Sequence, residues 1–291
     1  MIPGKFEYLV PATLDEAISM LNEHSFEAKI LAGGQSLIPA MRFRLAAPEI
    51  LIDINRIEGL SYLKEENGYL AIGAMTREAD IDESELVRHK YSLLADTARV
   101  IADPLVRNMA TVGGNLAHAD PANDHPATML AYGANIVAVG PEGERTISID
   151  GFFVDLFENS MADNEILKEI RIPTPPAHSG GAYLKIERKV GDYAVAAVAV
   201  QLTLDGETCA AARIGLTNVS SKPVRATGAE AALIGQTLTE ATIKAAGQAA
   251  AQDCDPSGDL RGPVEYKRDL VRVITVRAIR KAAARAKGGA A

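Results

Sequence analysis

The sequence is poor in aromatic residues and in cysteine. It contains no Trp, aromatic residues make up 5% of its 291 residues, and the two cysteines, Cys209 and Cys254, lie far apart. The interior must therefore be filled mainly by Ala, Val, Ile and Leu. An iron–sulfur cluster takes four ligands of the cysteine type, so this chain alone cannot hold one. We expect both cysteines to be small buried residues.

Several function classes lack their usual signals. The formal net charge is −8, which argues against a nucleic-acid partner. No apolar run approaches the roughly 18 residues of a membrane-spanning helix, and the N-terminus lacks the apolar region of a signal peptide. We therefore expect a cytoplasmic protein, with peripheral association at the inner membrane face left open. No serine lies in a GxSxG sequence, and neither GxGxxG nor GxxxxGK[ST] occurs, so nucleophile-elbow, Rossmann and P-loop sites have no support.

Two glycine pairs in apolar surroundings are the clearest positive signal. Gly33-Gly34 follows an apolar stretch, and Gly113-Gly114 lies in a second segment further along the chain. Glycine lacks Cβ, so the backbone can turn sharply and bring N–H groups close to a ligand. We predict that both pairs present free N–H groups, which would suit a pyrophosphate. An ordinary tight turn is the competing interpretation of each pair.

The strings around the glycines resemble a known family. Residues 31–39 (LAGGQSLIP) are similar to the first flavin-binding segment, AGGxSLxP, of the FAD-binding medium subunit of molybdenum hydroxylases. Residues 101–104 (IADP) and 107–115 (RNMATVGGN) resemble the second segment. Residues 120–124 (DPAND) and 188–194 (RKVGDYA) resemble the DPxND and RKxGDYA motifs.

The resemblance covers nearly the whole chain. Residues 215–218 (GLTN) and 222–225 (KPVR) are similar to the C-terminal signature of the same family, and the match runs from residue 1 to about residue 287. Its nearest form is the medium subunit of the carbon monoxide dehydrogenase type.

The resemblance implies an α+β fold in two domains. Residues 1–175 would form an FAD-binding domain of the vanillyl-alcohol oxidase and p-cresol methylhydroxylase type, with subdomains of about 1–55 and 56–175. Residues 177–287 would form a smaller C-terminal domain with a three-stranded antiparallel sheet and a helical bundle.

The function implied is electron transfer within an oxidoreductase. FAD, held non-covalently, would take electrons from the [2Fe-2S] clusters of a small subunit and pass them to an external acceptor. The molybdenum cofactor would lie in a large subunit, and the assembly would be a dimer of heterotrimers. No catalytic residue and no metal ligand is expected in this chain. The cofactor-binding residues predicted are Leu31, Ala32, Gly33, Gly34, Gln35, Ser36, Leu37, Ile101, Thr111, Val112, Gly113, Gly114, Asn115, Asp124, Leu167, Lys185, Asp192 and Tyr193.

Two of these positions have competing interpretations. Asp124 lies with His118, Asp120 and His125 in a segment that we expect to be a loop, where carboxylates commonly cap backbone N–H groups. The spacing fits no regular zinc pattern. The resemblance instead makes Asp124 a hydrogen-bond acceptor near the flavin ring or ribityl chain. Tyr193 is either an ordinary packing residue or, as the resemblance implies, a ring stacked on the isoalloxazine.

Local patterns predict the elements of the first domain. Thr13 and Glu16 form a capping box ahead of a helix with Leu14, Ala17 and Leu21 on its apolar face. A single helix is predicted over residues 84–101, ending before Pro104. Strands are predicted over residues 29–32, 49–54, 69–73, 135–139 and 165–172.

A Pro- and Gly-rich boundary at residues 173–181 precedes a different pattern. Strands are predicted over residues 182–189, 194–204 and 211–218, with a hairpin at Asp205-Gly206. Ala-rich helices follow from residue 226, and the last covers residues 264–287. Its cations, from Arg272 to Lys287, would lie on the exposed face and at the C-terminal end, where the helix dipole favours them, or would bind an acidic partner.

Two other functions stay open. One is a stand-alone flavin-dependent reductase or oxidase of the same fold, which needs a general acid that the sequence does not place. The other is a non-catalytic dinucleotide-binding module.

Overall fold

The N-terminal layer is a small parallel sheet covered by one helix. The computed structural model describes residues 2–24 and 26–289. Strands β1 (Glu7–Leu9), β3 (Ile50–Asp53) and β2 (Ala28–Leu31) pair in that order. Helix α1 (Leu14–His24) packs on this sheet through Ala17, Ile18 and Leu21. Strand β2 leads directly into the first glycine pair, and α2 (Leu37–Arg42) follows.

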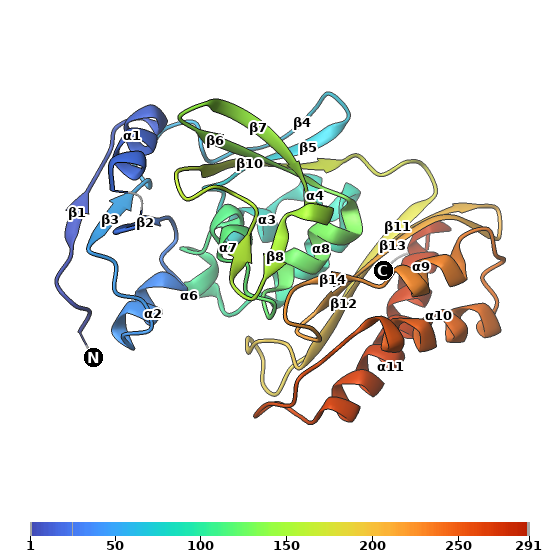
Figure 1. Ribbon diagram of the computed structural model, residues 1–291. Coiled ribbons are helices and arrows are strands. Elements are labelled where there is room, and N and C mark those ends of the chain that lie inside the picture. The colour runs from blue at the N-terminus through green and yellow to red at the C-terminus, as the bar shows by residue number, and fades with distance from the viewer. Residues whose placement is uncertain (1, 25, 290–291) are drawn as a thin grey trace.

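The second layer is a five-stranded antiparallel sheet with helices on one side (Figure 1). Its order is β4 (Leu63–Glu66), β5 (Tyr69–Gly73), β10 (Ile166–Pro173), β6 (Asn135–Gly140) and β7 (Gly143–Ser148). The helices beneath it are α3 (Glu78–Glu83), α4 (Glu85–Lys90), α5 (Ser92–Val100), α6 (Pro104–Arg107), α7 (Val112–His118) and α8 (Asp124–Tyr132). A short turn, η1 (Ile149–Gly151), and a hairpin of β8 (Phe153–Asp155) and β9 (Glu158–Asn159) complete the layer.

The single helix predicted over residues 84–101 is wrong. The chain breaks at Tyr91, whose φ of −123° and ψ of 57° separate α4 from α5. Tyr91 is fully buried, and its hydroxyl donates to Glu65 at 3.0 Å. The break therefore places a large ring in the core while its hydroxyl reaches a partner on β4.

The loop predicted around the His/Asp cluster is also wrong. His118 is the last residue of α7, and Asp124 and His125 begin α8. Thr111 is the N-cap of α7, since its hydroxyl accepts the N–H of Gly114 at 3.2 Å. The second glycine pair therefore lies in the first turn of a helix, whereas the sequence pattern suggested a turn without a helix.

The C-terminal layer is a four-stranded antiparallel sheet with helices on both faces (Figure 1). The three long strands predicted are present as β11 (Ser179–Ile186), β12 (Ala196–Asp205) and β13 (Thr208–Thr217), and a two-residue β14 (Val224–Arg225) adds an edge. The Asp205-Gly206 hairpin is confirmed by the pairing of Asp205 with Thr208. Helices α9 (Thr227–Leu233) and α11 (Val264–Ala286) pack on one face, and α10 (Glu240–Asp253) packs on these two helices. Helices α5 and α8 of the second layer cover the other face.

An ion-pair cluster joins the C-terminal helix to the second layer. Arg285 binds Asp96 of α5 through two nitrogens, at 2.7 and 3.0 Å, and Lys281 binds the same carboxylate at 3.1 Å. Arg280, also in α11, pairs with Glu240, and Lys287, the residue that follows the helix, pairs with Glu207. These cations therefore bind carboxylates of this chain. We predicted that Arg285 would lie on an exposed face, and this is wrong, because its side chain is largely buried against Asp96.

Of the helices in residues 2–24 and 26–289, none has both the length and the hydropathy that crossing a membrane requires.

Candidate functional site

A cavity of about 750 Å³ lies where the three layers meet. Sixteen of the eighteen predicted site residues line it: Ala32, Gly33, Gly34, Gln35, Ser36, Leu37, Ile101, Thr111, Gly113, Gly114, Asn115, Asp124, Leu167, Lys185, Asp192 and Tyr193. Leu31 and Val112 do not. The carbonyl of Leu31 accepts the N–H of Ile54 at 3.2 Å, and Val112 is fully buried in the core of the second layer.

The first glycine pair presents unpaired donors to this cavity. Gly34 has a φ of +73°, a conformation that favours glycine, and it lets the chain turn from β2 into α2. Within the described part of the chain, the N–H groups of Gly33, Gly34, Gln35 and Ser36 find no backbone acceptor. The Ser36 side chain caps nothing in α2. Consecutive free donors at a cavity wall form a binding surface for an anion.

The second glycine pair differs, and our prediction that its N–H groups are free is wrong. The N–H of Gly113 donates to the carbonyl of Ala74 at 3.0 Å, and that of Gly114 donates to Thr111. A Cβ on Gly113 would lie 2.6 Å from the Cβ and carbonyl oxygen of Ala74. Gly113 therefore allows α7 to approach the strand end. The buried Oδ1 of Asn115, in contrast, has no partner within the described residues.

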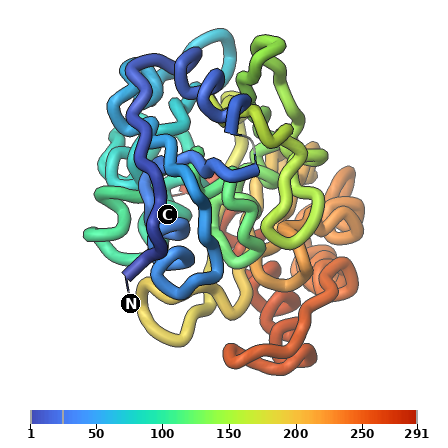
Figure 2. Tube along the Cα trace, turned by 60° about the vertical axis from the view of Figure 1, so that its left-hand side comes forward, coloured from blue at the N-terminus to red at the C-terminus, as the bar shows by residue number. Residues whose placement is uncertain are grey.

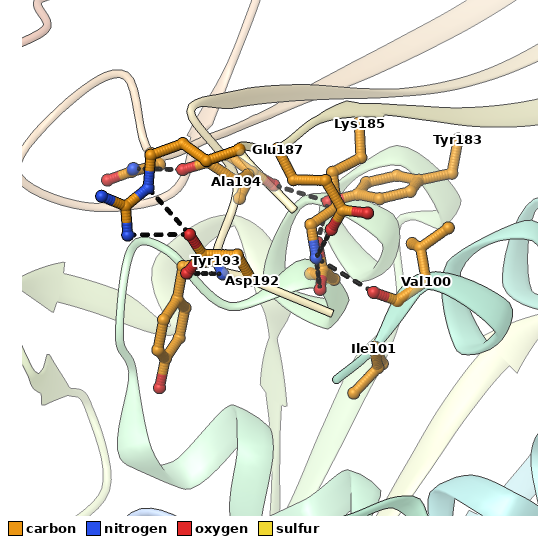
Figure 3. Close-up of polar contacts among 12 residues, drawn as sticks. Val100, Ile101, Tyr183, Lys185, Glu187, Asp192, Tyr193 and Ala194 are labelled. Atoms are coloured by element: carbon orange, nitrogen blue, oxygen red, sulfur yellow. Dashed lines mark hydrogen bonds and ion pairs between the residues drawn. The ribbon is translucent and has the colours of Figure 1, made fainter. Parts of the chain in front are cut away.

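A buried charge network forms another part of the wall. Figure 3 shows Tyr183, Lys185 and the carbonyl of Val100 converging on one point. Lys185 Nζ donates to Val100 O and to Asp124 Oδ2, both at 3.0 Å, while the Tyr183 hydroxyl donates to Asp124 Oδ1 at 2.6 Å. Burial raises the pKa of Asp124, and Lys185 opposes that rise. Both oxygens of Asp124 are thus engaged by the protein, and Asp124 holds the Lys185 ammonium at the cavity.

The turn between β11 and β12 supplies the aromatic ring that we predicted. Tyr193 is exposed, with 43% of its surface accessible, and its ring points away from Lys185 and Tyr183 (Figure 3). Burial raises the pKa of its hydroxyl, and the charge of Asp120 adds to that rise. Asp192 accepts hydrogen bonds from Arg188, from Arg261 and from the N–H of Tyr193. Burial would raise the pKa of Asp192, but these hydrogen bonds hold it below its ordinary value.

Sequence reasoning missed several residues of the cavity wall. Phe157 lies on the tip of the β8–β9 hairpin, with its ring centroid 5.2 Å from that of His118, and both line the cavity. Burial lowers the pKa of His118, which favours the neutral ring. The sequence marked His118 as part of a His/Asp cluster, whereas no sequence pattern marked Phe157. Among the described residues, no three His, Cys, Asp or Glu side chains gather as a metal site would require.

Arg261 was missed as well. It does not line the cavity itself and lies between α10 and α11, far in sequence from the wall residues, yet its guanidinium carbon is 5.6 Å from the centroid of the Tyr193 ring. No local pattern marks a single arginine in a loop, so only the folded arrangement identifies it.

Comparison with protein families gives two adjoining matches. The description "FAD binding domain in molybdopterin dehydrogenase" matches residues 4–175, and "CO dehydrogenase flavoprotein C-terminal domain" matches residues 181–282.

Curated relatives and solved structures match along nearly the full length. The carbon monoxide dehydrogenase medium chain of Hydrogenophaga pseudoflava is 44% identical over 98% of this chain and 99% of its own. Subunit alpha of the 6-hydroxypseudooxynicotine dehydrogenase complex of Paenarthrobacter nicotinovorans is 37% identical, covering 99% and 97%. A carbon monoxide dehydrogenase structure from Hydrogenophaga pseudoflava superposes with a TM-score of 0.96 at 46% identity, covering 98% and 99%.

Proposed function

The chain belongs to the family of FAD-binding medium subunits of molybdenum hydroxylases, and on that premise we propose that its cavity holds FAD for electron transfer. When bound, FAD supplies the redox chemistry by which electrons from iron–sulfur clusters reach an external acceptor. The protein contributes binding, orientation and electrostatics. The chain is thus an oxidoreductase subunit, and conversion of the substrate takes place in another subunit.

The observation that carries this proposal is the row of free N–H groups on residues 33–36. A cavity wall with unpaired donors fits a pyrophosphate, since several N–H groups can converge on its oxygens. The unpartnered Oδ1 of Asn115 is a hydrogen-bond acceptor, so it suits a hydroxyl or N–H group of the cofactor and not the pyrophosphate oxygens. We assign pyrophosphate binding to the free N–H groups of the first segment, and we place Gly114 and Asn115 of the second segment beside the cofactor at the cavity wall.

The redox-active ring would lie further along the cavity, toward the C-terminal layer. Tyr193 offers one aromatic face, and an offset stack on a flat ring stabilises binding. Lys185 Nζ lies 3.0 Å from Asp124 Oδ2 and 3.5 Å from Glu187 Oε2, so these two carboxylates offset its charge. What Lys185 offers a polar ring edge is an N–H donor held in a fixed position. The apolar side chains of Ile101 and Leu167 complete the walls that we assign to the ring.

Partners follow from the family. Relatives are medium chains of multi-subunit dehydrogenases, so large and small subunits are the partners, and we propose a dimer of heterotrimers in the cytoplasm. We keep residues 1–175 and 177–287 as the proposed domains. Named relatives act on substrates as different as carbon monoxide and 6-hydroxypseudooxynicotine, so the substrate of this complex is set by the partner subunit.

The test is purification of the full chain alone and with its genomic neighbours. We expect equimolar FAD on the chain alone, no turnover of small substrates without partners, and a larger assembly by mass measurement on co-expression. A colourless chain would contradict the flavin site. Substrate turnover by the isolated chain would favour the stand-alone reductase or oxidase instead.

A further inference from the structure

Two loops of the C-terminal layer meet beside the cavity. One joins β11 to β12 and carries Asp192 and Tyr193, and the other joins α10 to α11 and carries Arg261. Figures 1 and 2 show both loops at the same end of the molecule. Arg261 Nη2 lies 3.3 Å from Asp192 Oδ1, and the Arg261 guanidinium carbon is 5.6 Å from the Tyr193 ring centroid.

The loop that carries Arg261 is itself anchored. Asp259 accepts the backbone N–H of Arg261 at 2.8 Å, and the buried Lys267 binds the other oxygen of Asp259 at 2.9 Å. Lys267 lies in α11, so the loop is tied to the longest helix of the layer. These hydrogen bonds therefore fix the backbone of Arg261 relative to α11.

The guanidinium has few other partners. Its Nε is buried and has no hydrogen-bond partner among the described residues, although leaving a buried donor unpaired carries a free-energy cost. Within the described residues, the Arg261 side chain contacts the Asp192 carboxylate and the Tyr193 ring. A cation over an aromatic face is attracted by the electrons of the ring, and this attraction favours one orientation of the ring.

We propose that Arg261 is a positioning residue that holds the Tyr193 ring in its orientation at the cavity. This inference rests on the proposed function, because the ring matters for electron transfer only if the flavin lies against it. Arg261 does not line the cavity itself. It acts through Tyr193, and its contacts with Asp192 and Tyr193 link the two loops.

Arg188 provides a matched control within the same turn. It binds the same carboxylate, Asp192, at 2.9 Å, and within the described residues the cation over the Tyr193 ring is Arg261 and not Arg188. Arg188→Met removes a cation from Asp192 and leaves the ring contact, whereas Arg261→Met removes both. The difference between the two variants isolates the contact with the ring.

The experiment compares full-length, FAD-loaded chains at equal flavin occupancy. Arg261→Met, Arg188→Met, Tyr193→Ala and the double variant Tyr193→Ala/Arg261→Met are measured for bound-flavin emission and reduction potential. Loss of the cation over the ring is expected to shift the ratio of stacked to unstacked Tyr193 by about two- to fivefold. Emission should therefore rise in Arg261→Met, toward the value for Tyr193→Ala, and stay at the wild-type value in Arg188→Met.

The double variant tests whether Arg261 acts through the ring. If it does, Arg261→Met adds nothing in the Tyr193→Ala background, as expected of two coupled residues. Arg261→Lys is measured as well, because Lys keeps a cation near the ring, and it should fall between wild type and Arg261→Met. Equal emission in wild type and Arg261→Met, or additive effects in the double variant, would overturn the inference. Failure of every chain to bind FAD would instead contradict the proposed function.

Discussion

The first glycine segment, residues 32–36, leaves its N–H groups without a backbone acceptor, whereas the second, residues 111–115, donates its N–H groups within the protein. The first turns through the positive φ of Gly34 and faces the cavity with free donors. The second begins helix α7, and Gly113 lets that helix approach Ala74. A glycine pair beside a cavity can therefore serve ligand binding or packing, and the partners of its N–H groups distinguish the two roles.

The largest effect is expected at Gly113. In Gly113→Ala the new Cβ would lie 2.6 Å from atoms of Ala74. Overpacking against backbone should lower the free energy of unfolding by about 1–3 kcal/mol. Urea unfolding of the FAD-free chain measures this loss, with Gly151→Ala as a control for a glycine whose φ is not positive and whose Cβ would meet nothing within 4 Å. A Gly113→Ala chain as stable as wild type would contradict the packing role of the second segment.

A substitution at Gly114 should lower both the stability of the chain and its affinity for FAD. A Cβ there would lie 2.7 Å from Thr111 Oγ1 and 3.6 Å from the Cβ of Ala32, where the two segments meet at the cavity. In Gly114→Val, disturbance of the N-cap should lower stability by about 1 kcal/mol. Because the added methyl groups lie at the cavity wall, binding of FAD should weaken by about 1–3 kcal/mol. The FAD content after gel filtration is the measurement, and full occupancy with unchanged affinity would remove Gly114 from the site.

Ser36 and Thr111, one hydroxyl residue in each segment, distinguish ligand binding from helix capping. Ser36→Ala should leave unfolding unchanged, because Ser36 caps nothing, and should weaken FAD binding by about 1 kcal/mol through one lost hydrogen bond. Thr111→Ala should lower stability by about 1 kcal/mol, because it removes the N-cap of α7. Unfolding curves and FAD titrations of both variants give the comparison. The reverse pattern would exchange the roles that we assign to the two segments.

The smallest effect concerns pH, since neither glycine segment contains a titratable side chain. The folded protein holds the pKa of Asp192 below its ordinary value, so the unfolded chain binds its proton more readily. Stability from Asp192 is thus present above the ordinary pKa of an aspartate and is lost as pH falls through the folded value. Urea unfolding between neutral and acidic pH should show a shallower loss in Asp192→Asn than in wild type. The exposed Asp205→Asn serves as the control, and an unchanged pH profile in Asp192→Asn would contradict the prediction.

Local patterns were sufficient for most strands and for the longest helix. The Asp-Gly hairpin and the three long strands of the C-terminal layer follow from alternation and turn residues, which act over a few positions. The helix break at Tyr91 does not follow, because the buried Tyr91 ring and its hydrogen bond to Glu65 involve another element that no local pattern contains. The same holds for α7 and α8, where glycine, proline and histidine suggested a loop and packing produced helices.

The sequence by itself determined the family, the two glycine segments and sixteen of the residues that line the cavity, because these depend on short strings of residues. The tertiary structure alone decided which glycine pair keeps its N–H groups free, because the acceptor of Gly113 is Ala74, on a strand end far earlier in the chain. It also decided that Asp124 holds Lys185 and that Arg261 lies over Tyr193. Such contacts join residues whose separation in sequence carries no periodic signal, so only the packing of the three layers brings them together.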